Sequence, residues 1–564
     1  MPDALAAQVS VGTIVRVPLH GRRVRGWVTD ADVDVPAIDG VRLREIAAVV
    51  SAGPPPDLVD LCRWAAWRWA GPSAAFLRAA SPPNIVAPGN VPDREIAVYP
   101  SRPGLAAPPL TIASPGADLA ALVAGAIASE GSSVVVDPDA ERAARLVVML
   151  EHQGREVLEW RSERSDAEMT AAWDRARRGA CVVVGGRTAI WAPVPDLALA
   201  VIVDEADEAL EDERAPTWNA RDVAFERATR TAATVRVFTP APTIDAIVAL
   251  GEPKVPTPSS WPRVEVVDQR DEEPGHGLLS DALAQQLRRV RDAGGYSVCV
   301  LNRRGRARLL ACRTCGELAR CERCGATVAE RDDGLACSRC ELVRPPVCLH
   351  CHATRFRAVR PGVARVRDDL AALLPRASVV AVEASTAEVP EADVLIGTEA
   401  VLHRTRRPAG LVAFLEIDQE LLAPRARAAE QALWLLVRGA RLLGDRADGG
   451  VLLLQTRLAD HEVVVAARNG DPMVVADGER ARRRVLGWPP FGGAAELSGE
   501  AVAVGAACRA LRALESVAVL GPVEDGTRAL VRAATVDALC DALVHAEPAH
   551  ALGRLRVDVD PRRA

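Results

Sequence analysis

Lysine is almost absent from this sequence. Of its 564 residues, Lys254 is the only lysine, and the other 68 of the 69 basic residues are arginines. Any chemistry that requires a lysine ammonium group must therefore use position 254, which lies in the Pro-rich stretch "GEPKVPTPSSWP". A GC-rich genome would produce the same arginine bias. The scarcity of lysine therefore excludes lysine-dependent chemistry elsewhere in the chain, but it does not indicate a function.

The sequence predicts neither a membrane-spanning helix nor a secretory leader. Apolar runs such as "LVVML" at 146–150 are far shorter than the roughly 20 apolar residues that a membrane-spanning helix needs. The opening "MPDALAAQVS" has no basic segment followed by an apolar one. The net charge of −6 excludes a globally basic nucleic-acid binder but permits local basic patches. We therefore expect a globular, cytoplasmic protein.

Alternating strand and helix patterns predict several domains. A chain of 564 residues is long enough for about three or four cores. Short β-branched runs alternate with amphipathic stretches in two series, which is typical of parallel α/β domains. The predicted units are an N-terminal domain at 1–80, a Pro-rich linker at 81–109, α/β units at 110–250 and 262–456, a cysteine-dense insert at 309–355 and a small α+β domain at 457–564.

The N-terminal domain is predicted to begin with a small β unit. Residues 11–28 alternate apolar and polar positions, and the expected turn is basic, with Arg22, Arg23 and Arg25. Residues 57–80 predict one helix that carries several tryptophans. We interpret these tryptophans as core residues, because such a stripe at helical spacing is more often buried than used for base stacking.

Four Cys-x-x-Cys pairs form the strongest motif in the sequence. Two cysteines separated by two residues bring their thiolates toward one tetrahedral centre, and two such pairs complete a four-cysteine zinc site. Eight ligands therefore predict two structural zinc ions with no open coordination position. The pairs are Cys312 and Cys315, Cys321 and Cys324, Cys337 and Cys340, and Cys348 and Cys351.

The spacing of these pairs predicts how they combine. Twelve residues separate Cys324 from Cys337, enough for a hairpin, but only five separate Cys315 from Cys321. We therefore expect the two inner pairs to share one zinc and the two outer pairs to share the other. Redox-active or coincidental cysteines and an iron–sulfur cluster are the alternatives.

The cysteine-dense region is locally basic. Residues 301–367 contain 15 arginines against 6 aspartates and glutamates, a formal charge of +9. Two zinc ions and eight thiolates would lower this charge by 4 in a full-ionisation count, to about +5. A surface that faces nucleic acid is favoured, with an ordinary solvated arginine-rich face as the alternative.

The segment "VIVDEAD" at 201–207 is typical of the metal and water end of a nucleotide-hydrolysing site. A buried strand is followed directly by the carboxylates of Asp204 and Glu205. Such a site also needs a glycine-rich phosphate loop with a lysine and a hydroxyl residue. The segment where that loop is expected reads "TIASPGADLAALV" and contains no lysine.

Several motifs, taken in order, resemble the PriA replication restart family. They are "VGTIVRVPLHGRRVRGWV", "GGRTAIWAPVPDLALAVIVDEAD", "PTWNARDVAFERA", "LNRRGRARLLACRTCG", the four cysteine pairs, "DVLIGTEA" and "WPPFGG". The resemblance covers nearly the whole chain. It implies two RecA-like lobes of the P-loop NTPase type, a small β-rich N-terminal domain that binds DNA 3′ ends, a double zinc-ribbon module inserted in the second lobe and a C-terminal α+β domain.

The resemblance also implies particular site residues. Asp204 and Glu205 fall on the Mg²⁺-binding and water-activating carboxylates of the family's DEEH box. Asn302 to Gly305 match its NRRG motif, and Gly397 and Thr398 match its GTQ motif. The residues expected to contact DNA are Arg22, Arg23, Arg303 and Arg304.

Departures from the family pattern affect the nucleotide site above all. The DEEH box becomes Asp-Glu-Ala-Asp here, and Ala440 and Leu443 occupy the arginine-finger positions of the last motif, with Arg438 and Arg441 nearby but out of register. An arginine finger alone is worth about 10³–10⁵ in rate. We therefore expect Asp204 and Glu205 to be vestigial, with no ATP or Mg²⁺ bound and no catalysis.

The sequence thus predicts a helicase-like protein without helicase activity that assembles primosomes at abandoned or branched forks. The partners implied by the resemblance are forked DNA with single-strand/double-strand junctions, single-stranded DNA-binding protein and the primosome proteins that reload the replicative helicase, at the nucleoid and away from membranes. Two alternatives are an active ATP-dependent 3′→5′ helicase with a non-standard ATP site and a zinc-ribbon adaptor that binds only proteins.

Overall fold

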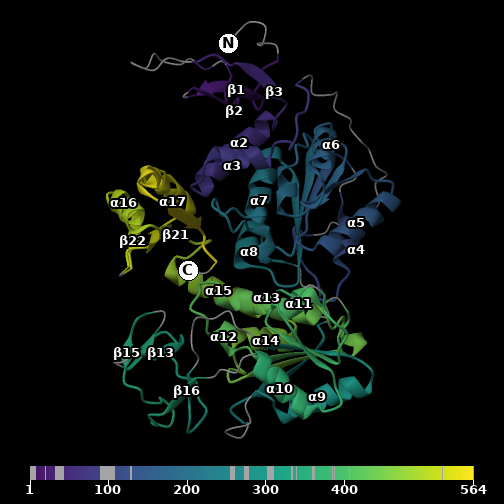
Figure 1. The fold of residues 1–564 in the computed structure, drawn as a ribbon, viewed down its shortest axis with the longest axis vertical. Coiled ribbons are helices and arrows are strands. Elements are labelled where there is room, and N and C mark those ends of the chain that lie inside the picture. The colour runs from purple at the N-terminus through teal and green to yellow at the C-terminus, as the bar shows by residue number, and fades with distance from the viewer. Residues whose placement is uncertain are drawn as a thin grey trace.

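The computed structural model places two stacked α/β lobes at the centre of the molecule (Figure 1). The N-terminal unit lies at one end of the first lobe, the cysteine-rich insert lies beside the second lobe, and the C-terminal domain lies beside the first lobe. The structure describes residues 8–19, 21–31, 33, 44–88, 108–127, 130–253, 261–271, 278–301, 310–331, 334–337, 340–358, 363–383, 385–386, 388–405, 407–523 and 525–562.

The N-terminal unit is a three-stranded antiparallel sheet packed on two helices. Its order is β2-β1-β3, with β1 Ile14–Leu19, β2 Arg22–Trp27 and β3 Ala48–Ser51. The single helix predicted over 57–80 is wrong: the chain forms α2 (Pro56–Arg68) and α3 (Ser73–Ala79). Pro72 explains the break, because a proline restricts the residue before it to extended backbone and cannot continue a helix.

Trp69 joins this unit to the first lobe, as expected for a core residue, whereas Trp64 and Trp67 are only half-buried. Trp69 is 1% exposed and meets Trp64 edge to face at 5.4 Å. Phe76 lies between Trp69 at 6.2 Å and Trp191 of the lobe at 5.9 Å, measured between ring centres. Aromatic rings in such tilted and edge-to-face arrangements bury large apolar areas. The N-terminal unit is therefore packed directly against the first lobe through these aromatic contacts.

The first lobe is a six-stranded parallel sheet with helices on both faces. Its strand order is β4-β9-β8-β5-β7-β6, and its valine-rich strands are buried, as expected for a parallel sheet covered on both sides. The elements are β4 Leu110–Ile112, α4 Leu119–Ala126, β5 Ser132–Val136, α5 Ala140–His152, β6 Val157–Trp160, α6 Asp166–Ala176, β7 Val182–Gly185, η1 Arg187–Trp191, β8 Leu197–Val203, η2 Glu208–Leu210, α7 Ala220–Thr231, β9 Thr234–Thr239 and α8 Ile244–Leu250.

The second lobe repeats this architecture. Its parallel sheet has the order β10-β20-β19-β11-β18-β17. Helices α14 and α15, which follow the last strand of this sheet, pack in the same core as α13. The elements are β10 Arg263–Asp268, α9 Asp281–Asp292, β11 Ser297–Leu301, α10 Val363–Leu373, β17 Val379–Val382, β18 Val394–Gly397, α11 Ala400–Arg404, β19 Leu411–Glu416, α12 Asp418–Leu421, α13 Ala428–Arg441, η3 Arg446–Asp448, β20 Val451–Thr456, α14 Glu462–Asn469 and α15 Met473–Leu486.

The cysteine-rich insert and the C-terminal domain are the remaining two units. With them, the predicted fold class is confirmed. The insert holds two small antiparallel sheets, and the C-terminal sheet is antiparallel with the order β22-β23-β21-β24. No helix among the described residues is long and apolar enough to span a membrane. The elements are β12 Leu310–Cys312, β13 Val328–Arg331, β14 Gly334–Cys337, β15 Val343–Arg344, β16 Phe356–Ala358, β21 Gly493–Gly499, α16 Ala501–Arg512, β22 Val517–Leu520, β23 Arg528–Ala533, α17 Val536–Leu543, η4 Val544–Leu552 and β24 Leu555–Val559.

Candidate functional site

A cleft of about 1280 Å³ lies between the two lobes. It is lined by the segments that follow β4, β5 and β8 of the first lobe and by α13 of the second lobe. The carboxyl ends of parallel strands are where α/β folds place their ligands. The cleft is therefore the candidate nucleotide site, and the charges inside it decide what it can hold.

Asp204 stands at the end of β8 and is neutralised by the protein itself. Its carboxylate is 1% exposed and accepts hydrogen bonds from Arg142 at 2.7 Å and from Arg441 at 2.5 Å. Burial acts to raise the pKa of Asp204, but the two guanidinium groups outweigh it and hold that pKa below its usual value. Arg142 also binds Asp137 at 2.6 Å. Cationic side chains therefore occupy the surroundings of the carboxylate expected to hold Mg²⁺.

Glu205 is fully buried and its two oxygens are both engaged. The backbone N–H of Thr243 donates to one oxygen at 2.6 Å, and the Thr243 hydroxyl and Arg221 donate to the other at 2.9 and 3.3 Å. Burial raises the pKa of Glu205, with Arg221 opposing the shift. A carboxylate that activates water needs a free oxygen facing its substrate. Here Glu205 instead connects β8 to the start of α8.

The segment that would cradle phosphates is capped and covered. Asp118 accepts a hydrogen bond from the backbone N–H of Ala121 at 3.1 Å, so a carboxylate caps α4 where a phosphate loop would present backbone N–H groups to phosphate. The Ser114 hydroxyl donates to Asp445 of the second lobe at 3.2 Å. A Cβ added at Gly116 would come within 2.5 Å of the Asp445 carboxylate, so the two lobes touch here. Lys254 lies outside the described residues.

Sequence reasoning missed the positions of Arg438 and Arg441. Both side chains enter the cleft from α13: Arg441 reaches Asp204, and Arg438 reaches Asp207 at 3.1 Å and Glu399 at 2.6 Å. Ala440 and Leu443, at the expected arginine positions, are buried in the core of the second lobe. The signal was available, because residues three apart on a helix share a face.

The structure brings the eight cysteines together in the two predicted sets. The outer set is Cys312, Cys315, Cys348 and Cys351, and the inner set is Cys321, Cys324, Cys337 and Cys340. Within each set, the four sulfur atoms all lie within 4.8 Å of one another.

The sulfur geometry fits a tetrahedral metal ion. The sulfurs of Cys312 and Cys351 are 3.5 Å apart, and those of Cys324 and Cys337 are also 3.5 Å apart. Four sulfurs at about 2.3 Å from zinc would lie about 3.8 Å from one another. Burial acts to raise the pKa of Cys312, but the backbone N–H groups of Cys315 and Thr314 outweigh it and lower that pKa to about 7. The donor set can hold two zinc ions.

Arg344 has a structural role between the two cysteine sets. Its guanidinium donates to the carbonyls of Val347 at 2.5 Å and Arg320 at 3.2 Å, which immediately precede Cys348 and Cys321. Its side chain is buried. This arginine therefore joins the two candidate metal sites and does not contribute to a DNA-facing charge.

Arginines gather on one face of the N-terminal sheet. Arg16 of β1 lies directly opposite Arg25 of β2, and Arg23 projects to the same face two residues from Arg25, whereas Arg22 projects to the other face. All four side chains are exposed. Like charges opposite one another destabilise a sheet, and within the described residues no ion pair offsets them. Arg303 and Arg304 lie outside the described residues.

Comparisons with known proteins agree on one family. A family model of the PriA 3′ DNA-binding domain (3′BD) matches residues 1–82. The chain is 30% identical over 336 residues to replication restart protein PriA of Treponema pallidum, covering 55% of this chain and 51% of that protein. It is 29% identical over 577 residues to probable replication restart protein PriA of Mycobacterium bovis, covering 91% of this chain and 86% of that protein.

The extent of these matches differs between relatives. The replication restart protein PriA of Bacillus subtilis is 26% identical, with 65% of this chain and 49% of that protein covered, so the chain spans about half the length of this relative and of the Treponema protein. Among solved structures, a DEAD box protein of Methanococcus jannaschii is 10% identical with a TM-score of 0.32, covering 64% of this chain and 85% of that one. The chain is a homologue of the replication restart proteins PriA and carries the 3′ DNA-binding domain of that family at its N-terminus.

Proposed function

We propose that this chain is a replication restart protein that binds forked DNA and serves as a fixed platform for primosome assembly, without helicase activity of its own. One observation carries the proposal: the carboxylates expected to serve Mg²⁺ and water bind Arg142, Arg441 and Thr243 instead. The phosphate segment also contains no lysine.

In this proposal two surfaces of the protein bind DNA, and two structural zinc ions stabilise the fold of one of these surfaces. The arginine face of the N-terminal sheet contacts phosphates near a 3′ end, and the arginine-rich insert contacts a second part of the fork. Structural zinc in the two cysteine sets fixes the insert. Single-stranded DNA-binding protein and helicase-loading primosome proteins are the proposed protein partners at the nucleoid.

ATP hydrolysis is the test of the non-motor claim. Because no lysine lines the cleft among the described residues and the carboxylates of Asp204 and Glu205 are already paired within the protein, the zinc-loaded protein is expected to show no DNA-stimulated ATPase above background. Phosphate release is measured with and without forked DNA. Turnover of about 1 s⁻¹, within the usual enzyme range, would overturn the claim and favour an active helicase, provided that Asp204→Asn abolished it.

Substitution on the arginine face tests DNA binding. Arg25→Ala is expected to weaken forked-DNA affinity and to reduce the salt slope of the binding constant by about one, because one phosphate contact is lost. Arg22→Ala, on the opposite face, is expected to weaken it less. The measurement is fluorescence anisotropy at several salt concentrations, with Arg468→Ala, an exposed position on α14, as the control. Undetectable or salt-insensitive binding by the unmodified chain would favour the protein-only adaptor.

A further inference from the structure

Ion pairs hold the two lobes against each other at several separate places. In the cleft, Arg441 binds Asp204 at 2.5 Å and Arg438 binds Asp207 at 3.1 Å. These arginines belong to α13 of the second lobe, whereas both aspartates follow β8 of the first. In a nucleotide-driven motor, arginines at this boundary are matched by the phosphates of ATP. In this chain they are matched by carboxylates of the chain itself.

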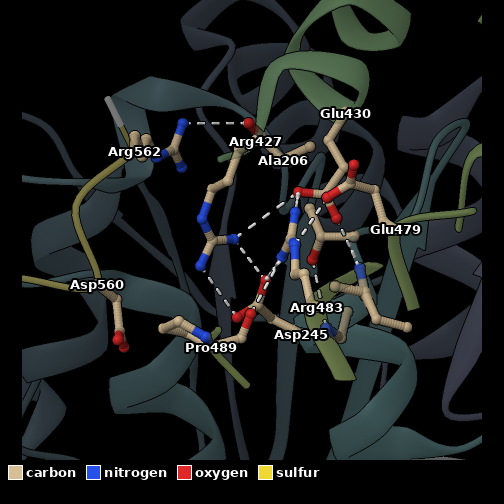
Figure 2. Close-up of polar contacts among 12 residues, drawn as sticks. Ala206, Asp245, Arg427, Glu430, Glu479, Arg483, Pro489, Asp560 and Arg562 are labelled. Carbon is tan, nitrogen blue, oxygen red and sulfur yellow. Dashed lines mark hydrogen bonds and ion pairs between the residues drawn. The ribbon is translucent and has the colours of Figure 1, made fainter. Parts of the chain in front are cut away.

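A second group of contacts lies deeper between the lobes, away from the cleft. Figure 2 shows Arg427 and Arg483 of the second lobe turned toward Asp245 of α8 in the first lobe, with Glu430 beside them. Arg427 binds Asp245 at 2.5 Å and Arg483 binds it at 3.4 Å, while Arg483 also binds Glu430 at 2.5 Å. Glu430 in turn accepts a hydrogen bond from the backbone N–H of Ile244 at 2.9 Å.

This second group is buried and its charges are matched. The side chains of Arg483, Glu430, Asp245 and Arg427 are between 3% and 12% exposed. Burial acts to raise the pKa of Asp245, but the surrounding arginines, Arg427 first, outweigh it and hold that pKa well below its usual value. Charged groups this far from water are tolerated only when they are paired. Separation of the lobes would break the pairs that Arg427 and Arg483 make with Asp245.

The C-terminal segment adds a third attachment. The Arg562 guanidinium donates to the carbonyls of Ala206 and Asp207, each at 3.3 Å, and binds Glu211 at 2.5 Å, all in the first lobe. Its own carbonyl accepts a hydrogen bond from Gln431 of α13 at 3.1 Å. The contact between Arg562 and Ala206 is visible beside the buried ion pairs (Figure 2). One residue of the last domain thus touches both lobes.

We propose that these contacts form an internal clamp that keeps the lobes in one closed arrangement without nucleotide, so that the chain presents its DNA-binding and protein-binding surfaces at a fixed spacing. The clamp consists of the Asp204–Arg441, Asp207–Arg438 and Asp245–Arg427 ion pairs together with Arg562. This inference rests on the proposed non-motor function and adds the physical reason why the lobes do not cycle.

The distance between the lobes tests the clamp directly. Fluorophores are attached through unnatural amino acids at the exposed positions Glu151 on α5 and Arg289 on α9, which leaves the candidate metal-binding cysteines untouched. Single-molecule energy transfer in the zinc-loaded protein is expected to give one narrow population that Mg²⁺-ATP does not shift. A wild-type population that is broad, or that moves when Mg²⁺-ATP is added, would overturn the proposal.

Variants identify which groups do the clamping. Arg427→Ala combined with Arg441→Ala is expected to add a second population of lower transfer efficiency, whereas Arg468→Ala on the same lobe leaves one population. Because the double variant leaves buried carboxylates unpaired and can fail to fold, Asp204→Asn with Asp245→Asn, which keeps the side-chain shapes, is measured as well and is also expected to add the open population. A single unchanged population in folded variants would refute the clamp.

DNA affinity, measured on the same wild-type sample, separates this inference from the proposed function. A narrow, ATP-insensitive population in a chain that does not bind forked DNA would support the clamp and refute the DNA-binding role. Forked-DNA binding together with an ATP-dependent distance between the lobes would support the DNA-binding role and refute the clamp.

Discussion

Cys321→Ala is expected to lower the zinc content from two ions to one per chain and to unfold the inner half of the cysteine-rich insert. Cys321 belongs to the inner set, whose four sulfurs lie within 4.8 Å of one another, and its sulfur is 3.5 Å from that of Cys340. A site of this kind holds its metal with an apparent free energy of about 10–16 kcal/mol at neutral pH, and that binding energy is also folding energy. Three remaining thiolates without a metal would repel one another and leave β13 and β14 with a small apolar core.

The measurement is metal analysis by mass spectrometry together with limited proteolysis of the insert. Cys508→Ala, at a buried cysteine of the C-terminal domain, is the matched control and is expected to keep both ions. Because Arg344 hydrogen-bonds to residues preceding both cysteine sets, the outer site is expected to bind its ion more weakly in Cys321→Ala. Two ions in Cys321→Ala, or fewer than two in the unmodified chain, would contradict the assignment.

Local patterns account for the parts of this structure that sequence reasoning predicted. The spacing between Cys315, Cys321, Cys324 and Cys337 was enough to separate the inner set from the outer set, because the constraint lies within 40 residues. Most strands of the two parallel sheets were predicted from their β-branched, apolar composition, but β6 and β9 of the first lobe were missed. The parallel arrangement followed from the alternation of strands with helices.

Long-range pairings account for what was missed. Asp204 meets Arg142, 62 residues away, and Arg441, 237 residues away. A motif comparison shows that expected residues are lost, but it does not show which side chains fill their places. The same limit applies to Arg562, whose role depends on how the C-terminal strand β24 passes the first lobe. The break between α2 and α3 was a different omission, since Gly71 and Pro72 were visible in the sequence.

A buried carboxyl group in the second lobe is expected to make stability depend on pH. Glu416 ends β19 and is 2% exposed. Burial, reinforced by the neighbouring Asp418, raises its pKa from 4.5 to about 8, although Arg457 opposes the shift. The folded protein therefore keeps this proton between pH 4.5 and about 8, whereas the unfolded chain releases it. The free energy of unfolding consequently falls as pH rises through this window and levels off above it.

Glu416→Gln removes this dependence, because the amide carries no charge at any pH. With about 1.4 kcal/mol per pKa unit, the variant is expected to be more stable than the unmodified chain by up to about 4 kcal/mol at pH 8.5, and nearly equal to it at pH 5. The measurement is the urea unfolding transition of the zinc-loaded protein at both pH values. Glu388→Gln, at an exposed carboxylate of the same lobe, is the control. A variant that is destabilised at pH 8.5, or that shows the same pH dependence as the unmodified chain, would mean that Glu416 is ionised in the folded protein and held by Arg457 and Gln419.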